Sequence, residues 1–552
     1  MLIRELSRQG PVTDNSPDSL SAQCGPRGLR ASTRGWSPEG TRVQLYGSTS
    51  LSGSDWYGGN GMTSLNRYRW PLRATVATAL AAWFALSSSA GASAATLIQL
   101  STDPYTNTTS QHRTELEPDT FAFGSTIVSV FQVGRFFNGG ASNIGFATSL
   151  DGGATWTSGF LPRTTVFATP PGIWARASDP SIAFDPKHGN WVTSYLGLAP
   201  NGSGINVVDV AASTSKDGIT WSKPVFINHS GLFNDKNWTV CDTTPTSPFY
   251  GNCYTEFDVV NFGDQEQMST STDGGQTWGP SQSVNNGVHG IGGQPLVQPN
   301  GNVIVPFVGF SAAKFLLKDF SSSDGGATWV FDRTITPIFF HHPAGGIRAG
   351  IPLPSAEIDA AGTVFVTWSD SRFEKSGAAS DLLLTSSPDG LNWTHPTRIP
   401  ADPIGSGVDH FIPGLAVDRN TAGGGAHLVA AFYYYPVANC TSATCQLKTG
   451  FTASADGGAS WSPTAQLAGP MSLSWLPNTT QGRMVGDYIS TSFSGAPAFP
   501  AFAAANAPSG TTFDEAIFTV SGGLAAAGTI AATDQNSSTS NDADASSDLT
   551  AQ

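Results

Sequence analysis

Apolar and polar residues recur along the chain in one pattern between residues 118 and 518. A polar or proline-containing segment leads into a short apolar run, an Asp/Asn-x-Gly turn follows, and a second apolar run comes next. Short apolar runs bounded by turn residues predict pairs of β-strands. The clearest pairs cover 178–195, 294–307, 353–368 and 412–435, with weaker versions at 118–131 and 254–268.

Each strand pair is followed by the same short phrase, in which a serine precedes Asp-Gly and a tryptophan closes the segment. The phrase predicts a turn: its aspartate accepts hydrogen bonds from nearby backbone N–H groups, its glycine takes a positive φ, and its tryptophan covers the sheet edge. The six copies are Ser149–Trp156, Ser215–Trp221, Ser271–Trp278, Ser322–Trp329, Ser387–Trp393 and Ser454–Trp461.

Six copies at intervals of about 50 to 70 residues are typical of a β-propeller, in which each repeat forms one blade. The phrase resembles the Asp box (BNR repeat) of the sialidase superfamily, and Gly482–Tyr488 and Asp409–Gly414 resemble segments of secreted bacterial proteins described as exo-α-sialidases. A seventh unit, Met484–Phe518, lacks the phrase, and Leu97–Leu100 is expected to join the last sheet. We therefore predict an all-β propeller of seven blades, with six as the alternative.

The N-terminal part of the chain predicts export. Three arginines at 67, 69 and 73, an uncharged stretch at 74–86 and small residues ending at Ala94 are typical of a signal peptide at 62–94. Residues 1–61 precede it and are interpreted as a disordered or misassigned leader. The propeller is assigned to 95–521, and 522–552, rich in small and polar residues, to a disordered tail. We expect a secreted, extracellular protein.

The net charge and the cysteine spacing limit the classes of partner that the chain is expected to bind. The formal net charge of −14 argues against nucleic acid and anionic membranes, and the apolar stretch of the signal peptide is too short to span a bilayer. The close cysteine pairs Cys241/Cys253 and Cys440/Cys445 predict two disulfides; zinc is the competing interpretation, but neither spacing is Cys-x2-Cys. No metal or cofactor is assigned, although a structural calcium in an acidic loop, such as that of Asp235 or Asp264, stays open. A monomer acting on carbohydrate is expected.

Polar residues gather just before and at the start of the first strand of each unit, which in a propeller opens onto a central funnel. The sialidase resemblance implies an arginine clamp for a substrate carboxylate, a tyrosine nucleophile activated by glutamate, and an aspartate acid/base. The substrate-binding candidates are Arg176, Arg348, Arg483 and His410. The catalytic candidates are Tyr488 (or Tyr254) as nucleophile, Glu256 as its base, Asp179 (or Asp119) as acid, and Asp487 in the same group.

These residues predict a glycan-active protein, most specifically a sialidase-like exo-glycosidase acting on a terminal carboxylated sugar. The Phe/Tyr-Arg-Ile-Pro motif of sialidases has no counterpart near the start of the propeller; Thr397-Arg398-Ile399-Pro400 lies on a predicted outer strand, and we interpret it as a chance match. Two alternatives stay open. One is a lyase acting on uronate polysaccharides, with His410, His342 or Tyr488 as its base. The other is a non-catalytic propeller that binds glycans or proteins, in which the rings of Trp174, Tyr250 and Tyr433–Tyr435 stack on sugars.

Overall fold

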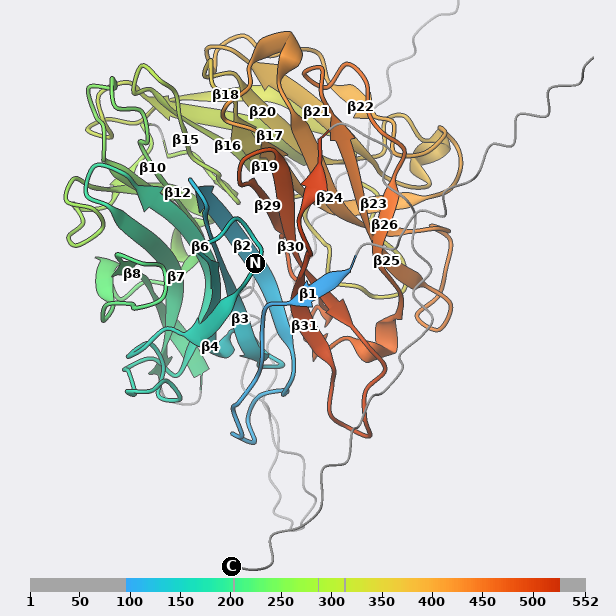
Figure 1. Ribbon diagram of the computed structural model, residues 1–552, viewed down its shortest axis with the longest axis horizontal. Coiled ribbons are helices and arrows are strands. Elements are labelled where there is room, and N and C mark those ends of the chain that lie inside the picture. Colours follow the sequence, from blue (N-terminus) through green and yellow to red (C-terminus); the bar gives the residue numbers. More distant parts are fainter. Residues whose placement is uncertain (1–95, 202–203, 286, 312–313, 527–552) are drawn as a thin grey trace, which may run out of the picture. The chain divides into compact units, whose positions relative to one another are not determined.

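A computed structural model describes residues 96–201, 204–285, 287–311 and 314–526, all of which belong to one unit of the chain (Figure 1). The predicted leader at 1–61 and signal peptide at 62–94 lie outside the described residues, as does most of the predicted tail. Strand β32 (Leu524–Ala525) lies beyond the predicted domain boundary at 521 and pairs with β30 (Pro497–Ala505). Within the described ranges, no helix is long and apolar enough to cross a membrane.

The fold is all-β and consists of antiparallel meanders, in which each strand pairs with the next along the chain. A single register pair, Ala141 with Ala177, joins the first two meanders into one eight-stranded sheet. The strands of the first meander are β2 (Glu115–Phe123), β3 (Thr126–Arg135), β4 (Ala141–Ser149) and β5 (Thr157–Phe160). Those of the second are β6 (Arg176–Asp185), β7 (Asn190–Asn201), β8 (Gly204–Ser215) and β9 (Val225–Asn228).

Three more meanders follow, and in the second of them two short strands, β14 and β15, share the partner β16. The first contains β10 (Asn234–Cys241), β11 (Cys253–Val259), β12 (Gln265–Ser271) and β13 (Gln282–Ser283). The second contains β14 (Gly290–Ile291), β15 (Leu296–Val297), β16 (Val303–Ser311), β17 (Lys314–Ser322) and β18 (Val330–Ile338). The third contains β19 (Ser355–Ile358), β20 (Val364–Asp370), β21 (Asp381–Ser387) and β22 (Thr397–Ile399).

The C-terminal part of the chain adds two more sheets and a short hairpin. The prediction that Leu97–Leu100 joins the last sheet is confirmed, because β1 (Leu97–Gln99) pairs with β31 (Glu515–Val520). The preceding meander contains β23 (Asp409–Val417), β24 (Leu428–Tyr435), β25 (Gln446–Ser454) and β26 (Ala465–Ser472). The hairpin consists of β27 (Asn478–Thr479) and β28 (Gly482–Arg483), and the last sheet of β29 (Ser490–Phe493), β30, β31, β32 and β1. Short 3-10 turns are η1 (Val260–Phe262), η2 (Lys375–Gly377), η3 (Gly423–Gly425) and η4 (Leu473–Trp475).

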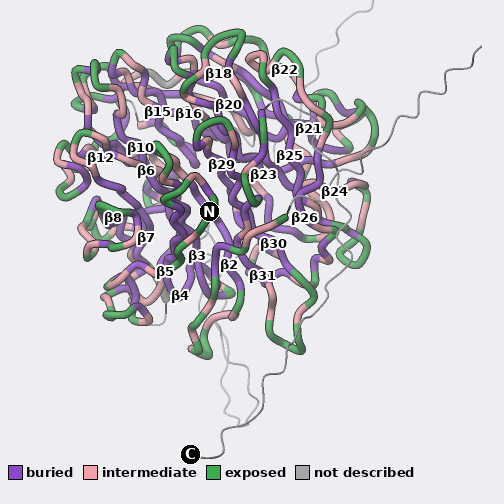
Figure 2. The backbone as a smooth tube through the Cα atoms, viewed as in Figure 1, coloured by how far each residue is buried: buried purple, intermediate pink, exposed green. Residues whose placement is uncertain are grey.

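The first strands of successive meanders lie side by side, with β15 taking this place in the fourth meander. Strand β2 contacts β6 and β29, β6 contacts β10, β10 contacts β15, β15 contacts β19, β19 contacts β23, and β23 contacts β29. Figure 2 shows these strands as largely buried, while the connecting loops carry most of the exposed positions. The core therefore lies between the sheets, and the first strands are largely enclosed by their neighbours.

The six repeated phrases form the predicted turns, here called the repeat turns, each following the third strand of a meander. In the first of them Asp151 accepts hydrogen bonds from the N–H and hydroxyl of Thr155 (2.9 and 2.6 Å), and Ser149 accepts one from the N–H of Gly153 (2.8 Å). Gly153 has a φ of 86°, and a Cβ there would lie 2.2 Å from Phe499 of the last sheet. Glycine is therefore required both for the turn and for the close approach of two sheets.

Both predicted disulfides are present. The first, Cys241–Cys253, joins residues in direct register on β10 and β11. The second, Cys440–Cys445, closes a short loop between β24 and β25.

Candidate functional site

Four of the first strands are interrupted by a β-bulge at corresponding points. The register shifts lie between Leu116 and Asp119, Ser178 and Ser181, Asp235 and Trp238, and Phe411 and Gly414. Each bulge contains one non-glycine residue with positive φ: Glu117 (54°), Asp179 (49°), Lys236 (30°) and Ile412 (53°). Such backbone costs about 1–3 kcal/mol per residue, and bulges re-aim side chains next to functional sites. Three of the four re-aimed side chains are ionisable.

The bulges of β2 and β6 meet the segment that leads into β29. Glu117 accepts a hydrogen bond from the N–H of Asp487 (3.2 Å) and another from the Gln132 amide. The same amide donates to the Ser178 hydroxyl (3.1 Å), which donates to Asp179 (2.5 Å). One hydrogen-bonded chain thus links three carboxyl groups, those of Glu117 on β2, Asp179 on β6 and Asp487 in the segment before β29. Together with Arg348, described next, Glu117, Asp179 and Asp487 form what we call the central carboxylate cluster.

Arg348 holds Asp487 through two parallel hydrogen bonds, Nε to Oδ1 (3.0 Å) and a terminal nitrogen to Oδ2 (2.6 Å). Arg348 is 1% exposed, so this ion pair is almost entirely removed from water. Bidentate pairs of this kind fix both the position and the orientation of the carboxylate. The predicted proximity of Arg348 and Asp487 thus takes the form of a direct salt bridge.

An aromatic pair and a lysine border the cluster. The Tyr488 hydroxyl donates to the backbone carbonyl of Pro180 (3.0 Å), and its ring meets Trp238 edge-on at 5.3 Å. The Lys236 ammonium lies 4.0 Å from the Tyr488 ring centroid and 4.5 Å from that of Trp238. Cation–π contacts therefore hold a positive charge between Tyr488 and Trp238, at the border of the cluster. Of these three side chains, Trp238 is the one that is partly exposed.

The pKa values of two neighbouring carboxyl groups of the cluster are shifted in opposite directions. Burial, and then the charges of Asp179 and Asp487, raise the pKa of Glu117 to about 8. Burial alone would also raise the pKa of Asp487, but the charge and hydrogen bonds of Arg348 outweigh it and lower that pKa. At pH 7 Glu117 therefore holds a proton while Asp487 is ionised. A protonated acid beside an ionised carboxylate is the combination that acid–base catalysis requires.

Tyr488 and Glu256 lie in surroundings that differ from their predicted roles. Burial, followed by the charges of Glu117 and Asp179, raises the pKa of Tyr488 well above its usual value, whereas a tyrosine nucleophile needs the opposite shift. Attack by Tyr488 would also require its hydroxyl to leave Pro180. Burial and the adjacent Glu266 likewise raise the pKa of Glu256 well above its usual value.

The three predicted clamp arginines each have a different partner. Arg176 donates to Asn138 (2.7 Å) and the carbonyl of Gly139 (2.8 Å), and burial lowers its pKa to about 10. Arg483 donates from its side chain to the carbonyl of Leu476 (2.7 Å), and its own carbonyl accepts the N–H of Arg348 (2.6 Å). Arg348 therefore belongs to the central cluster and Arg483 adjoins it through the backbone. A joint clamp stays a prediction.

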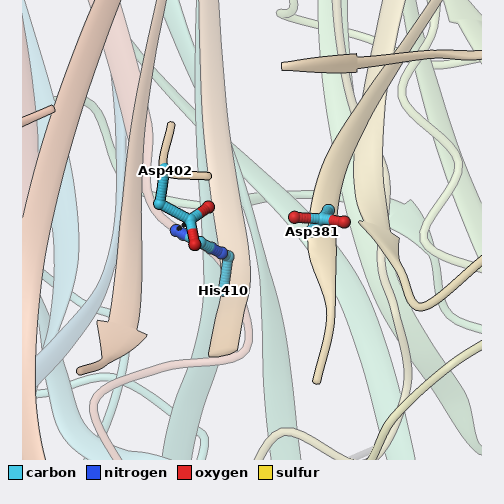
Figure 3. Close-up of side chains that lie close together, drawn as sticks. All are labelled: Asp381, Asp402 and His410. Atoms are coloured by element: carbon cyan, nitrogen blue, oxygen red, sulfur yellow. Dashed lines mark ion pairs between the residues drawn. The ribbon is translucent and has the colours of Figure 1, made fainter. Parts of the chain in front are cut away.

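His410 belongs to a separate buried group with Asp381 and Asp402, drawn in Figure 3. A potential metal-binding atom from each residue lies within 4.8 Å of the others. The cation of this group is Arg398, whose guanidinium contacts Asp381 (2.7 Å) and Asp402 (2.6 Å). The His410 ring contacts the carbonyl of Ser380 (3.1 Å), and burial lowers its pKa. An arginine of the chain itself thus provides the cation that both carboxyl groups contact.

A cavity of about 480 Å³ lies at the other end of β2, where residues Phe121 to Gly124 line it. It also contains Arg419, which pairs with Glu357 (3.2 Å) and stacks on Phe121 at 4.9 Å. The residues of the central carboxylate cluster do not line this cavity. The central carboxylate cluster and this cavity therefore lie in different places.

The chain is similar to several proteins of known structure, but it matches no sequence family. No family model and no curated protein matches the chain. A Hadza microbial sialidase is 15% identical with a TM-score of 0.39, over 65% of this chain and 66% of that one. A polysaccharide lyase described as an ulvan lyase is 12% identical with a TM-score of 0.45, over 78% and 97%. A Trypanosoma rangeli sialidase in complex with sialic acid is 13% identical with a TM-score of 0.38, over 62% and 57%. At this level of likeness, the chemistry must be argued from the residues.

Proposed function

We propose that the chain is a secreted, glycan-active enzyme with a seven-bladed β-propeller fold. Seven antiparallel meanders follow one another along the described residues, and each first strand contacts the next. The contact of β29 with β2 would close this series into a ring. Two disulfides are compatible with an oxidising compartment. The monomeric state and the signal peptide stay predictions.

The proposed active site is the central carboxylate cluster, and the observation that carries it is the pair Glu117 and Asp487. The two groups are neighbours, yet one has a pKa of about 8 and the other a lowered pKa. In the proposed reaction, Glu117 donates its proton to the glycosidic oxygen while the bond to the anomeric carbon breaks. Asp487, oriented by Arg348, takes a proton from the attacking water. Asp179 raises the pKa of Glu117, so we assign it a supporting role rather than that of the acid.

The proposed substrate is a terminal sugar that carries a carboxylate. The chain has a net charge of −14, so an anionic sugar needs local cations, and Lys236 provides one at the edge of the cluster. Trp238 is partly exposed beside Lys236 and offers a ring face on which a sugar can stack. The roles of Arg176, Arg483 and His410 in binding stay predictions.

A substrate screen with two matched variants tests this proposal. Purified protein is assayed with an aryl α-sialoside, other aryl glycosides of carboxylated sugars and uronate polysaccharides. Glu117→Gln should lower kcat/KM by about 10²- to 10⁴-fold, the usual contribution of a general acid. Glu115→Gln should leave it near the wild-type value, because Glu115 lies on the same strand, is equally buried and also has a pKa of about 8, yet contacts Ser101 instead of the cluster.

Three outcomes would contradict the proposal. Unsaturated products would indicate a lyase. Glycan binding without turnover would indicate a binding protein. Equal losses in the Glu115 and Glu117 variants would mean that the activity responds to any lost buried carboxyl group, and the cluster would have no special role.

A further inference from the structure

The cavity of about 480 Å³ has no part in the proposed reaction, and we call it the distal cavity. Most of its lining comes from the C-terminal halves of four first strands, which belong to different sheets. These are residues 121–123 of β2, Glu357 of β19, 416–417 of β23 and 491–493 of β29. The volume lies within the range of about 300–1,000 Å³ that is usual for small-molecule sites. Because four sheets share it, the cavity is part of the fold and does not depend on one loop.

The inner part of the distal cavity is lined by small, buried side chains, among them Thr120, Ala416, Thr491 and Ser492. The hydroxyls of Thr120 and Ser492 contact each other (3.2 Å), and the Thr491 hydroxyl donates to the carbonyl of Gly414 (3.4 Å). The small side chains leave space for a ligand. Their polar atoms already have partners inside the protein, so the groups that would recognise a ligand must lie in the outer part.

The outer part of the cavity presents a hydrogen-bond donor and an acceptor side by side. Arg419 donates to Glu357 (3.2 Å), and both side chains are partly exposed. Among the described residues, this is the one hydrogen bond that the guanidinium makes. An arginine has several N–H donors and a carboxyl group several acceptor sites, so most of them remain available to a ligand.

Two phenylalanines of β2 stand beside this pair. The Arg419 guanidinium lies 4.9 Å from the centroid of the Phe121 ring, a contact that holds the guanidinium in place. Phe123 is 42% exposed, and its ring packs against that of Phe184 with the centroids 4.5 Å apart. An exposed ring that a neighbour already holds loses little freedom when a ligand packs on it. The cavity thus combines fixed polar groups with an apolar surface.

The charges of the lining favour a neutral, polar ligand. Its ionisable residues are Arg419, Glu357 and Asp418. Two carboxyl groups beside a single cation disfavour an anion, and the guanidinium disfavours a metal ion or an amine. A wholly apolar ligand would remove water from the ion pair without replacing its hydrogen bonds.

We propose that the distal cavity binds a neutral sugar unit and is a second glycan site, separate from the proposed active site. Each hydroxyl of a sugar both donates and accepts hydrogen bonds, so two neighbouring hydroxyls match the adjacent guanidinium and carboxyl groups of Arg419 and Glu357. The C–H face of the sugar ring packs on Phe123. A glycan held at this site stays attached to the protein while the central carboxylate cluster is empty.

Binding to the full chain is measured by saturation-transfer NMR and calorimetry with methyl glycosides of glucose, galactose, mannose, rhamnose and N-acetylglucosamine, and with neutral oligosaccharides of these sugars. We expect saturable binding of at least one of them at one site. Arg419→Gln should weaken it about tenfold or more, through loss of charge-assisted hydrogen bonds. Arg113→Gln is the control, because Arg113 also pairs with one carboxylate at the surface but does not line the cavity.

A second pair of variants keeps the test independent of the ion pair. Phe123→Ala should weaken binding, whereas Phe226→Ala should not, because Phe226 is 43% exposed and also packs on aromatic neighbours but lies outside the cavity. Thermal unfolding of each variant checks that it is folded.

The proposal is overturned if no sugar of the panel binds, or if Arg419→Gln and Phe123→Ala both bind as tightly as wild type. Glu117→Gln should retain wild-type affinity for the neutral sugar, and its loss there would place the sugar in the central carboxylate cluster instead. These measurements do not involve catalysis. A protein that binds neutral sugar in the distal cavity but hydrolyses no glycoside would leave this site standing and remove the proposed function.

Discussion

The repeat turns and the first strands both carry acidic residues, yet the two regions hold their carboxyl groups in opposite protonation states. In the repeat turns, hydrogen bonds from Thr155, Thr220 and Ser460 lower the pKa of Asp151, Asp217 and Asp456 to about 2. On the first strand β2, burial raises the pKa of Glu115 and Glu117 to about 8 and that of Asp119 to about 6.

The difference follows from where each carboxyl group finds its donors. A turn surrounds its aspartate with backbone N–H groups and hydroxyls at the surface, so the charged form is favoured. A first strand uses its N–H groups in the sheet and hides its side chains from water, so the neutral form is favoured unless a cation is present. Asp487 is such a case, because Arg348 keeps its carboxyl group ionised although burial favours the neutral form.

The largest expected effect on stability comes from removing that cation. Arg348→Ala would leave the Asp487 carboxylate buried without its partner, so the free energy of unfolding should fall by about 3–5 kcal/mol. Arg113→Ala is the control, because Arg113 is half-exposed and its partner Asp514 also contacts solvent; it should cost less than about 1 kcal/mol. Urea unfolding of both variants tests this, and equal losses would show that the buried pair has no special weight.

The next effect is a dependence of stability on pH. Groups with raised folded-state pKa contribute stability that is fully present below their unfolded values near 4 and is lost as the pH rises through the folded values. Those folded values are about 6 for Asp119 and Asp381, 7 for Glu266, and 8 for Glu115 and Glu117. The repeat turns act the other way: their contribution is present above about pH 4 and lost as the pH falls through 2.

Stability should therefore be greatest near about pH 5 and fall by at least about 2 kcal/mol towards pH 8. His410 has the opposite effect. Burial lowers its pKa, so it reduces the free energy of unfolding below about pH 6.5, but it is a single group and the five carboxyl groups outweigh it. Unfolding by urea is followed at intervals from pH 4 to 9. A maximum at pH 8 would contradict the buried, protonated state of these carboxyl groups.

The smallest expected effect on the free energy of unfolding comes from a substitution in a single repeat turn. Asp217→Ala removes an acceptor for the N–H groups of Ile219 and Thr220, and the loss of a cap of this kind costs about 1 kcal/mol. This difference in the free energy of unfolding should disappear below pH 2, where Asp217 of the wild type is protonated in both the folded and the unfolded state. A loss as large as that of Arg348→Ala would show that the turn, not the buried pair, dominates stability.

The features that depend on nearby residues can be predicted from the sequence. The repeat turns and both disulfides involve residues close together in the chain, so composition and spacing are enough. The pairing of β1 with β31 also follows from the need of a short apolar segment to complete a sheet.

The site can be predicted only in part. Sequence alone identifies Asp179, Asp487 and Arg348 as polar residues leading into strands, but it assigns no role to Glu117, Lys236 or Trp238. Their placement depends on the β-bulges, and a bulge depends on the register with a strand elsewhere. A signal exists for one of them: Glu117-Pro118 occupies the same place in its unit as Asp179-Pro180. Lys236 lacks a following proline, and no comparable signal marks it.

The most direct test of the account is the pH dependence of kcat/KM for glycoside hydrolysis by wild type, Glu117→Gln and Glu115→Gln between pH 5 and 9. If Glu117 is the proton donor, wild-type activity declines as the pH rises through about 8, where this carboxyl group loses its proton. Glu117→Gln should lose this alkaline decline together with about 10²-fold or more of the rate, while Glu115→Gln retains both. A Glu117→Gln variant that keeps the wild-type rate and the same alkaline decline would show that Glu117 is not the proton donor.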